Sequence, residues 1–223
     1  TNQVIGASKI TRMVALARAA NLIVAVDDSS NVQQLSEIAS AAGAELGVIV
    51  EINVGQDRCG VDGDGGVELA RQIAASPGLR FDGLMGYEGH IVAERDYETR
   101  KTEAEKSMAV LLGAADQIRI AGIEVKVVSA SGTGTYSITG RVDGVTELQC
   151  GSYIFMDGDY VDVFDDFAPA LSVLATVVSR QREDLAVADL GLKSISIDRG
   201  FADVLSPTGA TIIGHSEEHT KIE

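Results

Sequence analysis

The sequence predicts an α/β protein with a parallel sheet, followed by a smaller all-β unit. Short apolar runs alternate with amphipathic stretches over about the first 168 residues, a pattern typical of parallel strands joined by right-handed helical crossovers. The chain has 24 glycines but only five Phe, five Tyr and no Trp, and small residues beside β-branched ones suit buried parallel strands. Beyond residue 168 the helical periodicity ends.

Helices and strands alternate from the N-terminal residues onward. We expect a helix over 8–20, because apolar residues recur there at helical spacing, with Ser8 as its N-cap. The run LIVAV at 22–26 is continuously apolar, as in a strand covered on both faces. A second helix over 32–42 follows a polar turn and ends at Gly43.

The same unit then recurs, with a glycine or proline after each helix. In order, the expected elements are strand 46–53, helix 65–75, strand 79–87, a long helix over about 95–120, and strands 124–129 and 146–156. Periodicity alone does not separate an open doubly wound sheet from part of a (β/α)8 barrel, so both stay open.

We place a domain boundary at Phe167-Ala168-Pro169, which divides the chain into 1–168 and 169–223. Only short strands without intervening helices are expected beyond it, at 170–178, 185–189, 194–197 and 210–213. The second unit is short for independent stability, so we expect it to lean on the first or to be part of a longer domain.

Composition excludes several classes of partner. The chain has 18 basic and 33 acidic residues, a net charge of −15, so it lacks the basic face that binds nucleic acid and would be repelled by anionic membranes. Two cysteines suit a reducing compartment, so we expect a cytoplasmic protein. Because the sequence begins at Thr1 and not at Met, we expect a processed product or an internal fragment.

Glycine-rich loops follow two neighbouring strands at their carboxyl ends, where sites lie in parallel α/β folds. Ser131–Thr135 alternates glycine with hydroxyl residues, so its N–H groups can form an anion-binding nest, although an ordinary turn is equally consistent. Gly151-Ser152 adds a second pair of N–H groups. The two loops together could hold one phosphate, as in many phosphosugar or nucleotide binders.

Three side chains near these loops could contribute chemistry. Arg58 follows a glycine turn after a buried strand, where a guanidinium can pair with an oxyanion, although a surface ion pair is the plainer interpretation. The Tyr87 hydroxyl could reach a cofactor, and His90 is a catalytic candidate, although a lone histidine is more often structural. Cys59 and Cys150 are interpreted as small core residues.

No metal ligand is assigned. His215 and His219 are four positions apart, but the surrounding stretch lacks the helix that would place both on one face. The aspartates over 157–166 lack the spacing and the terminal glutamate of an EF-hand, so we expect a solvated loop.

At these same strand ends the sequence resembles the D-threonine aldolase and D-serine dehydratase family of pyridoxal-phosphate enzymes, which share the alanine-racemase type of barrel. The nearest look-alikes are the D-threonine and 3-hydroxyaspartate aldolases. The matching segments run in family order: TNQVIGASKI at the start, EINVGQDRCGVDG at 51–63, GLMGYEGH at 83–90, SASGTGTY at 129–136, TELQCGSYIFMDGDY at 146–160, VADLGLKS at 187–194 and HSEEHTKIE at the end.

The resemblance implies a (β/α)8 barrel, of which about five strands are present, followed by part of a C-terminal β domain. It implies pyridoxal 5'-phosphate as cofactor, with Arg58 facing the phenolic oxygen of the ring and Gln149 near the ring nitrogen. The residues that it implies around the phosphate and ring are Tyr87, Thr133, Gly134, Gly151, Ser152 and Tyr153.

The implied activity is that of a lyase on D-β-hydroxy amino acids, which cleaves them to glycine and an aldehyde with the help of a divalent metal (Mn, Mg or Zn). A D-serine or D-3-hydroxyaspartate dehydratase is one alternative, and a non-catalytic domain that binds pyridoxal phosphate or another phosphate ligand is a second. The resemblance also implies a small-molecule D-amino acid substrate and a homodimer.

Two expected groups lie outside this sequence. The family's Schiff-base lysine belongs to a segment upstream of Thr1 and the metal ligands to one downstream of Glu223, so neither Lys9 nor Lys193 is assigned and the chain alone is expected to be inactive. The chain departs from the family at Glu88 and His90, where Tyr-His-Gly-Ser is common, and in Ala130-Ser131-Gly132, where a glycine triplet is common. These departures bear on substrate specificity rather than on phosphate binding.

Overall fold

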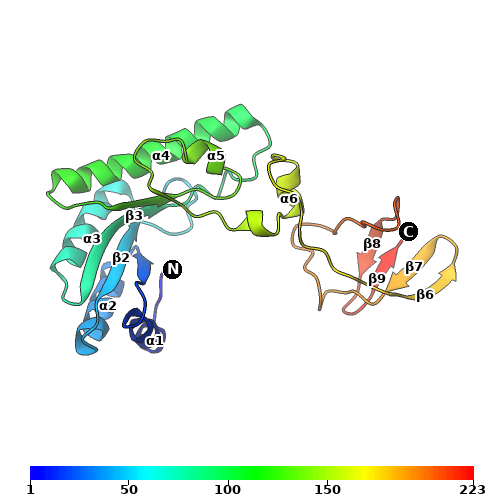
Figure 1. Ribbon diagram of the computed structural model, residues 1–223, viewed down its shortest axis with the longest axis horizontal. Helices are drawn as coiled ribbons and strands as arrows, with labels where there is room; N and C mark the ends of the chain where they lie inside the picture. The colour runs from blue at the N-terminus through cyan, green and yellow to red at the C-terminus, as the bar shows by residue number, and fades with distance from the viewer. The chain divides into compact units, whose positions relative to one another are not determined.

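A computed structural model describes residues 1–223, which form two compact units, Thr1–Tyr153 (unit 1) and Ile154–Glu223 (unit 2) (Figure 1). The boundary expected between residues 168 and 169 stays a prediction.

Unit 1 contains one sheet of five parallel strands, as predicted, in the order β1-β2-β3-β4-β5. The strands follow the chain order, so each βα unit adds one strand to the same side of the sheet. Their bounds are β1 Ile23–Val26, β2 Leu46–Glu51, β3 Leu79–Gly86, β4 Val127–Ala130 and β5 Glu147–Leu148.

Four helices pack side by side against one face of this sheet (Figure 1). They are α1 Ala7–Ala17, α2 Ser29–Ala41, α3 Gly63–Ala75 and α4 Tyr97–Ile120, and a single-turn helix, α5 Tyr136–Thr139, follows β4. All four long helices were predicted. Their buried apolar residues form one core with the strands.

Side chains along the strands alternate between two faces. Val48 and Val50 of β2 join the core beneath the helices, whereas Ile49 and Glu51 lie on the opposite face and are also buried. Burial on both sides explains why these strands read as continuous apolar runs.

Two helix starts show how local sequence sets the ends. The side chain of Asp28 accepts hydrogen bonds from the backbone N–H groups of Ser30 and Asn31, which caps α2. The N-cap predicted for α1 was wrong, although the helix forms: the N-cap is Gly6, and Ser8 lies inside the first turn.

The strand expected over 146–156 is also much shorter than predicted. β5 ends at Leu148, and a 3-10 turn, η1, covers Ser152–Ile154. The N–H of Gln149 still donates to the carbonyl of Ala130 in β4, but four residues later the N–H of Tyr153 donates to the hydroxyl of Thr133 and not to a neighbouring strand. The apolar residues of this stretch are therefore not strand residues.

Unit 2 contains an antiparallel sheet in the order β6-β7-β9-β8. Its elements are α6 Gly158–Val161, β6 Val177–Arg182, β7 Leu185–Ala188, β8 Ile212–His215 and β9 Thr220–Ile222. The strand expected at 194–197 is absent, because the N–H groups of Ser194 and Ile195 both donate to the carbonyl of Gly191 and form a turn. Sequence reasoning missed β9.

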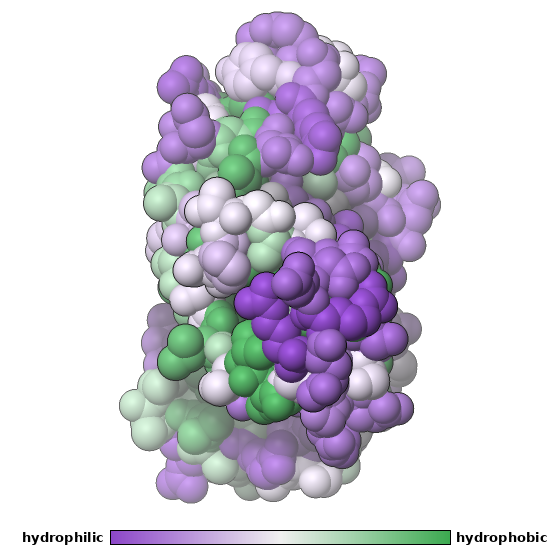
Figure 2. Space-filling model, turned by 90° about the vertical axis from the view of Figure 1, so that its right-hand side faces the viewer, coloured by the Kyte–Doolittle hydropathy of each residue, from purple (hydrophilic) through white to green (hydrophobic).

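Unit 2 buries few of its large apolar side chains. Leu174 is 98% exposed and Leu205 is 78% exposed. On the face drawn in Figure 2, hydrophobic residues lie at the surface beside hydrophilic ones.

No helix in the structure combines the length and the hydrophobicity needed to cross a membrane.

Candidate functional site

The loops that follow the five parallel strands lie along the carboxyl edge of the sheet, because parallel strands all end on the same side. Hydrogen bonds join some of these loops directly. The N–H of Gly60, after β2, donates to the carboxylate of Asp27, after β1, at 3.0 Å. The hydroxyl of Ser107, on α4, donates to the carbonyl of Val54 at 2.9 Å.

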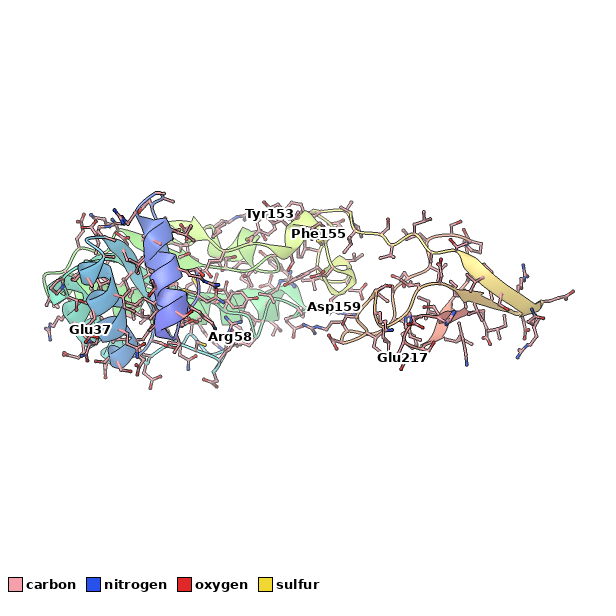
Figure 3. The ribbon with its side chains drawn as sticks, turned by 90° about the horizontal axis from the view of Figure 1, so that it is seen from below. Glu37, Arg58, Tyr153, Phe155, Asp159 and Glu217 are labelled. Atoms are coloured by element: carbon pink, nitrogen blue, oxygen red, sulfur yellow. The ribbon has the colours of Figure 1, made fainter.

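Asn53 shapes the loop that carries Arg58. Its side-chain carbonyl accepts from the N–H groups of Gly55 and Asp57, at 3.1 and 3.2 Å, and its amide donates to the Asp57 carboxylate at 2.8 Å. Asp57 has a left-handed backbone with φ of 55°, which the Asn53 contacts stabilise. The exposed Arg58 follows directly (Figure 3).

The Arg58 guanidinium forms no ion pair, so the surface ion pair that its sequence suggested does not form. Its carbon Cζ lies 5.2 Å from the centre of the Tyr87 ring, within the range of a cation–π contact. Burial raises the pKa of the Tyr87 hydroxyl, and the nearby Arg58 charge partly opposes that rise. Arg58 and Tyr87 are thus brought together by loops after β2 and β3.

The Tyr87 ring packs directly on glycines. A Cβ placed on Gly132 would lie 2.9 Å from the ring atom Cε2, and one on Gly89 would lie 2.3 Å from Cε1. His90 is exposed and lies over Gly55, where a Cβ would come within 3.2 Å of the imidazole. The tyrosine therefore connects the Arg58 loop to the glycine-rich segment after β4.

This segment, Ser131–Thr135, is hereafter the anion loop. The N–H of Thr135 donates to the carbonyl of Gly132 and closes the turn, while the N–H groups of Thr133 and Gly134, both buried, find no acceptor in the chain. A Cβ on Gly134 would lie 1.7 Å from the carbonyl oxygen of Val92, so only glycine fits there.

The segment Gln149–Tyr153, hereafter the β5 loop, lies against the anion loop. The N–H of Tyr153 donates to the hydroxyl of Thr133 at 3.1 Å, and the N–H groups of Gly151 and Ser152 have no acceptor. Two neighbouring loops thus offer four free backbone donors. Thr133 and Gly134 are buried, and buried N–H groups are almost always paired, whereas Gly151 is exposed and Ser152 is half-buried. Two buried donors beside two accessible ones fit an anion such as a phosphate.

Gln149 is also anchored from the sheet. Its N–H donates to the carbonyl of Ala130 at 2.8 Å, and its side-chain amide donates to the hydroxyl of Ser129 at 3.0 Å. That hydroxyl donates to the carboxylate of Glu147 at 2.6 Å. The chain of contacts holds the Gln149 side chain in one orientation.

Sequence reasoning missed Glu88 as a functional residue and treated it only as a departure from the family pattern. Its side chain is fully buried and accepts hydrogen bonds from Ser131, Thr135 and Thr139. The available signal was a charged residue between Tyr87 and glycine, directly after a buried strand.

The remaining candidate lysines and cysteines have different surroundings, and Cys150 is itself part of the β5 loop. Lys9 is exposed on α1, and the ammonium of Lys193 pairs with Glu218 at 2.5 Å. Cys59 is exposed, contrary to the prediction of a core residue, and burial raises the pKa of the half-buried Cys150 thiol.

The two histidines of unit 2 lie in different surroundings. His215 lies in β8, with its Nδ1 atom 2.6 Å from the hydroxyl of Thr220, whereas His219 is exposed in the turn before β9. No group of three His, Cys, Asp or Glu side chains in the structure could hold a metal ion.

Comparison with known proteins identifies two families. The model described as the alanine racemase N-terminal domain matches residues 4–159, and that of a serine dehydratase domain matches residues 170–223. A 3-hydroxy-D-aspartate aldolase from Paracoccus denitrificans is 37% identical over all of this chain and 60% of its own length. A D-threo-3-hydroxyaspartate dehydratase from Delftia sp. is 32% identical over 83% of this chain and 50% of its own length.

A solved structure of a related enzyme is also similar to this chain. The D-threonine aldolase from Filomicrobium marinum superposes with a TM-score of 0.95 at 38% identity, over 99% of this chain and 61% of that one. The 223 residues therefore span about 60% of the length of such relatives. The five-stranded sheet is part of an alanine-racemase-like barrel, and unit 2 corresponds to a C-terminal β domain.

Proposed function

The chain belongs to the family of the alanine racemase N-terminal domain, and from this premise we propose that it binds pyridoxal 5'-phosphate at the carboxyl edge of its parallel sheet. The observation that carries the proposal is the set of four unpaired N–H groups, at Thr133, Gly134, Gly151 and Ser152, on two loops that touch. Phosphate oxygens would satisfy all four donors.

The cofactor's second anionic group is its phenolic oxygen, and we assign Arg58 to it. In a chain with 33 acidic residues, a guanidinium that pairs with no carboxylate is available for a ligand anion. Tyr87 holds this guanidinium through its ring. The link through Tyr87 and Gly132 connects the Arg58 loop to the phosphate donors, which favours one pocket over unrelated loops.

We assign Gln149 to the ring nitrogen, because contacts from Ser129 hold its amide in place. Tyr153 would line the ring and phosphate from the β5 loop. His90 is the candidate for proton transfer, since it is exposed at the same edge. When bound, pyridoxal phosphate stabilises negative charge at the α-carbon of an amino acid.

The proposed activity is that of a lyase on D-β-hydroxy amino acids. The bond between the α- and β-carbons breaks, the β-hydroxyl gives up its proton as the aldehyde forms, and a proton on the α-carbon completes glycine. The relatives named as aldolases support this choice, and the Delftia dehydratase supports loss of the β-hydroxyl as the second candidate. No residue of this chain is assigned as the Schiff-base lysine or as a metal ligand.

Cofactor binding is tested by titrating the encoded protein, with any residues that its gene carries on either side, with pyridoxal 5'-phosphate and, as the control, with pyridoxal. Because charge-assisted hydrogen bonds contribute roughly 1.5–3 kcal/mol each, we expect pyridoxal to bind at least about 100-fold more weakly. Equal affinity for the two compounds, or no binding of either, would contradict the proposed site. Cofactor fluorescence gives both dissociation constants.

The reaction is tested in the encoded protein, with any residues that its gene carries on either side. D-threonine and D-3-hydroxyaspartate are supplied, with their L-isomers as controls. Glycine and an aldehyde would indicate the lyase, whereas a 2-oxo acid and ammonia would indicate the dehydratase. Cofactor binding without either product would favour the non-catalytic alternative.

We also propose that the protein is a cytoplasmic homodimer and that its substrate is a small D-amino acid. We propose further that its two domains divide between residues 168 and 169. The change of pattern after Ala168 and the family model that begins at residue 170 support this division. Light scattering on the encoded protein tests the dimer.

A further inference from the structure

We propose that Glu88 is a positioning residue: its buried carboxylate holds the anion loop in the shape that leaves the Thr133 and Gly134 N–H groups free for a phosphate. The inference rests on the proposed function, because the phosphate is that of the proposed cofactor.

All three hydrogen bonds to Glu88 come from one segment. Its oxygen Oε2 accepts from the N–H of Ser131 at 3.0 Å, and Oε1 accepts from the hydroxyls of Thr135 and Thr139 at 2.7 Å each. The side chain has no exposed surface. A carboxylate that is buried needs such donors to offset its lost hydration, so the segment and the carboxylate hold one another in place.

The bond to Ser131 supports an unfavourable backbone conformation. Ser131 has φ of 78°, in the left-handed region that favours glycine. In that conformation its N–H points to the Glu88 carboxylate, and the bond offsets part of the conformational cost. A flexible βα turn with the same sequence, but without this hydrogen bond, would not be held in the left-handed conformation at Ser131.

The hydroxyl of Thr135 links Glu88 to a second backbone N–H group, that of Gly132. This hydroxyl donates to Glu88 and accepts from the N–H of Gly132 at 3.1 Å. The N–H groups of Ser131 and Gly132 are therefore occupied, directly or through Thr135. The next two N–H groups, of Thr133 and Gly134, are left for an external acceptor.

Electrostatic repulsion considered alone predicts that Glu88 weakens phosphate binding, which is the opposite of the positioning role. A carboxylate beneath a phosphate repels it, so neutralising Glu88 would strengthen phosphate binding if that repulsion dominated. Glu88→Gln keeps the size of the side chain, but its amide nitrogen must face either the Ser131 N–H or the two hydroxyls. If the nitrogen faces Ser131, that hydrogen bond is lost; if it faces the two threonines, their hydroxyls must turn to accept, and the Thr135 hydroxyl that accepts from the Gly132 N–H is reoriented. In both orientations charge-assisted hydrogen bonds are replaced by weaker neutral ones, so the positioning role predicts weaker binding.

The test compares Glu88→Gln and Thr135→Val with Thr139→Val in the encoded protein, with any residues that its gene carries on either side. Thr139 donates to the same carboxylate, but its hydroxyl makes no bond to the anion loop, so it is the matched control. We expect the dissociation constant for pyridoxal 5'-phosphate to rise at least about tenfold in the first two variants and to stay within about threefold of the parent in the third.

Amide hydrogen exchange provides a second readout. The Ser131 and Gly132 amides should exchange faster in Glu88→Gln and Thr135→Val than in the parent, and at the parental rate in Thr139→Val. A general loss of stability would instead lower the melting temperature of all three variants without separating their affinities.

Tighter or unchanged cofactor binding by folded Glu88→Gln overturns the proposal. If that variant does not fold, equal affinities of Thr135→Val and Thr139→Val overturn it. If the parent binds no pyridoxal 5'-phosphate, the proposed function fails, and the exchange rates alone decide whether Glu88 orders the loop; unchanged rates at Ser131 and Gly132 then reject this inference as well.

Discussion

Two arginines show how differently one residue type is used in this molecule. Arg80 binds the buried carboxylate of Asp82 through two hydrogen bonds, at 2.7 and 2.8 Å, and pairs with Glu45. It lies at the start of β3, at the amino edge of the sheet, where parallel α/β folds place stabilising contacts. Arg58 lies at the carboxyl edge and pairs with no carboxylate, which suits a ligand-binding role.

Replacing Arg58 tests that role. We expect Arg58→Ala to weaken binding of pyridoxal 5'-phosphate by roughly 10- to 100-fold, because a hydrogen bond to a charged group is lost. Arg58→Lys should recover only part of the affinity, since a lysine lacks the planar fork. The dissociation constant is measured by fluorescence titration.

Arg71→Ala is the matched control, since Arg71 is exposed on α3 and pairs only with Glu68. Its affinity for the cofactor should equal that of the parent. If Arg58→Ala binds as tightly as Arg71→Ala, Arg58 does not contact the ligand. The melting temperature should change little in either variant, because both side chains are exposed.

At the scale of elements, α4 and the loops beside it hold the carboxyl edge together. Ser107 of α4 bonds the Val54 carbonyl after β2, and Ala104 packs with Ile91 and Ile138. The segment after β3 therefore lies between α4 and the anion loop, which explains the close approach of Val92 to Gly134.

Two glycine-to-alanine substitutions should have opposite effects on stability. In Gly134→Ala the new Cβ would meet the Val92 carbonyl at 1.7 Å, so we expect a loss of roughly 1–3 kcal/mol. Gly113 lies within α4 with no atom near its Cβ position, so Gly113→Ala should add about 1 kcal/mol. Urea unfolding followed by circular dichroism measures both changes. A loss of stability in Gly113→Ala would contradict the packing described for α4.

At the scale of the whole molecule, the dominant feature is a net charge of −15. The ion pairs of the structure lie mostly at the surface, as between Lys106 and Glu103, whose side chains are 65% and 41% exposed. Such pairs contribute little to stability, so repulsion among the excess acidic groups is the larger electrostatic effect.

Salt should therefore stabilise the protein. Because the Debye length falls from about 30 Å at 0.01 M to about 8 Å at 0.15 M, we expect the melting temperature to rise over that range. NaCl and KCl should act alike, since screening depends on ionic strength. A melting temperature that falls with either salt would mean that the ion pairs outweigh the repulsion.

Much of the fold was predictable because its signals are local. Each signal is visible within a dozen residues: a continuous apolar run at Leu22–Val26, and apolar residues at helical spacing in α4. Both elements form nearly where expected. β5 was overextended, because the apolar residues after Gly151 resemble a strand although their backbone bonds a side chain instead.

The α/β alternation, the five parallel strands and the two glycine loops at one edge of the sheet follow from the sequence alone, because periodicity and glycine placement act over short stretches of chain. That Arg58 has no carboxylate partner and that Glu88 bonds to the anion loop is visible only in the folded chain. The Glu88 contacts join residues 43 to 51 positions apart, and hydrogen bonds over such separations leave no periodic trace in a sequence.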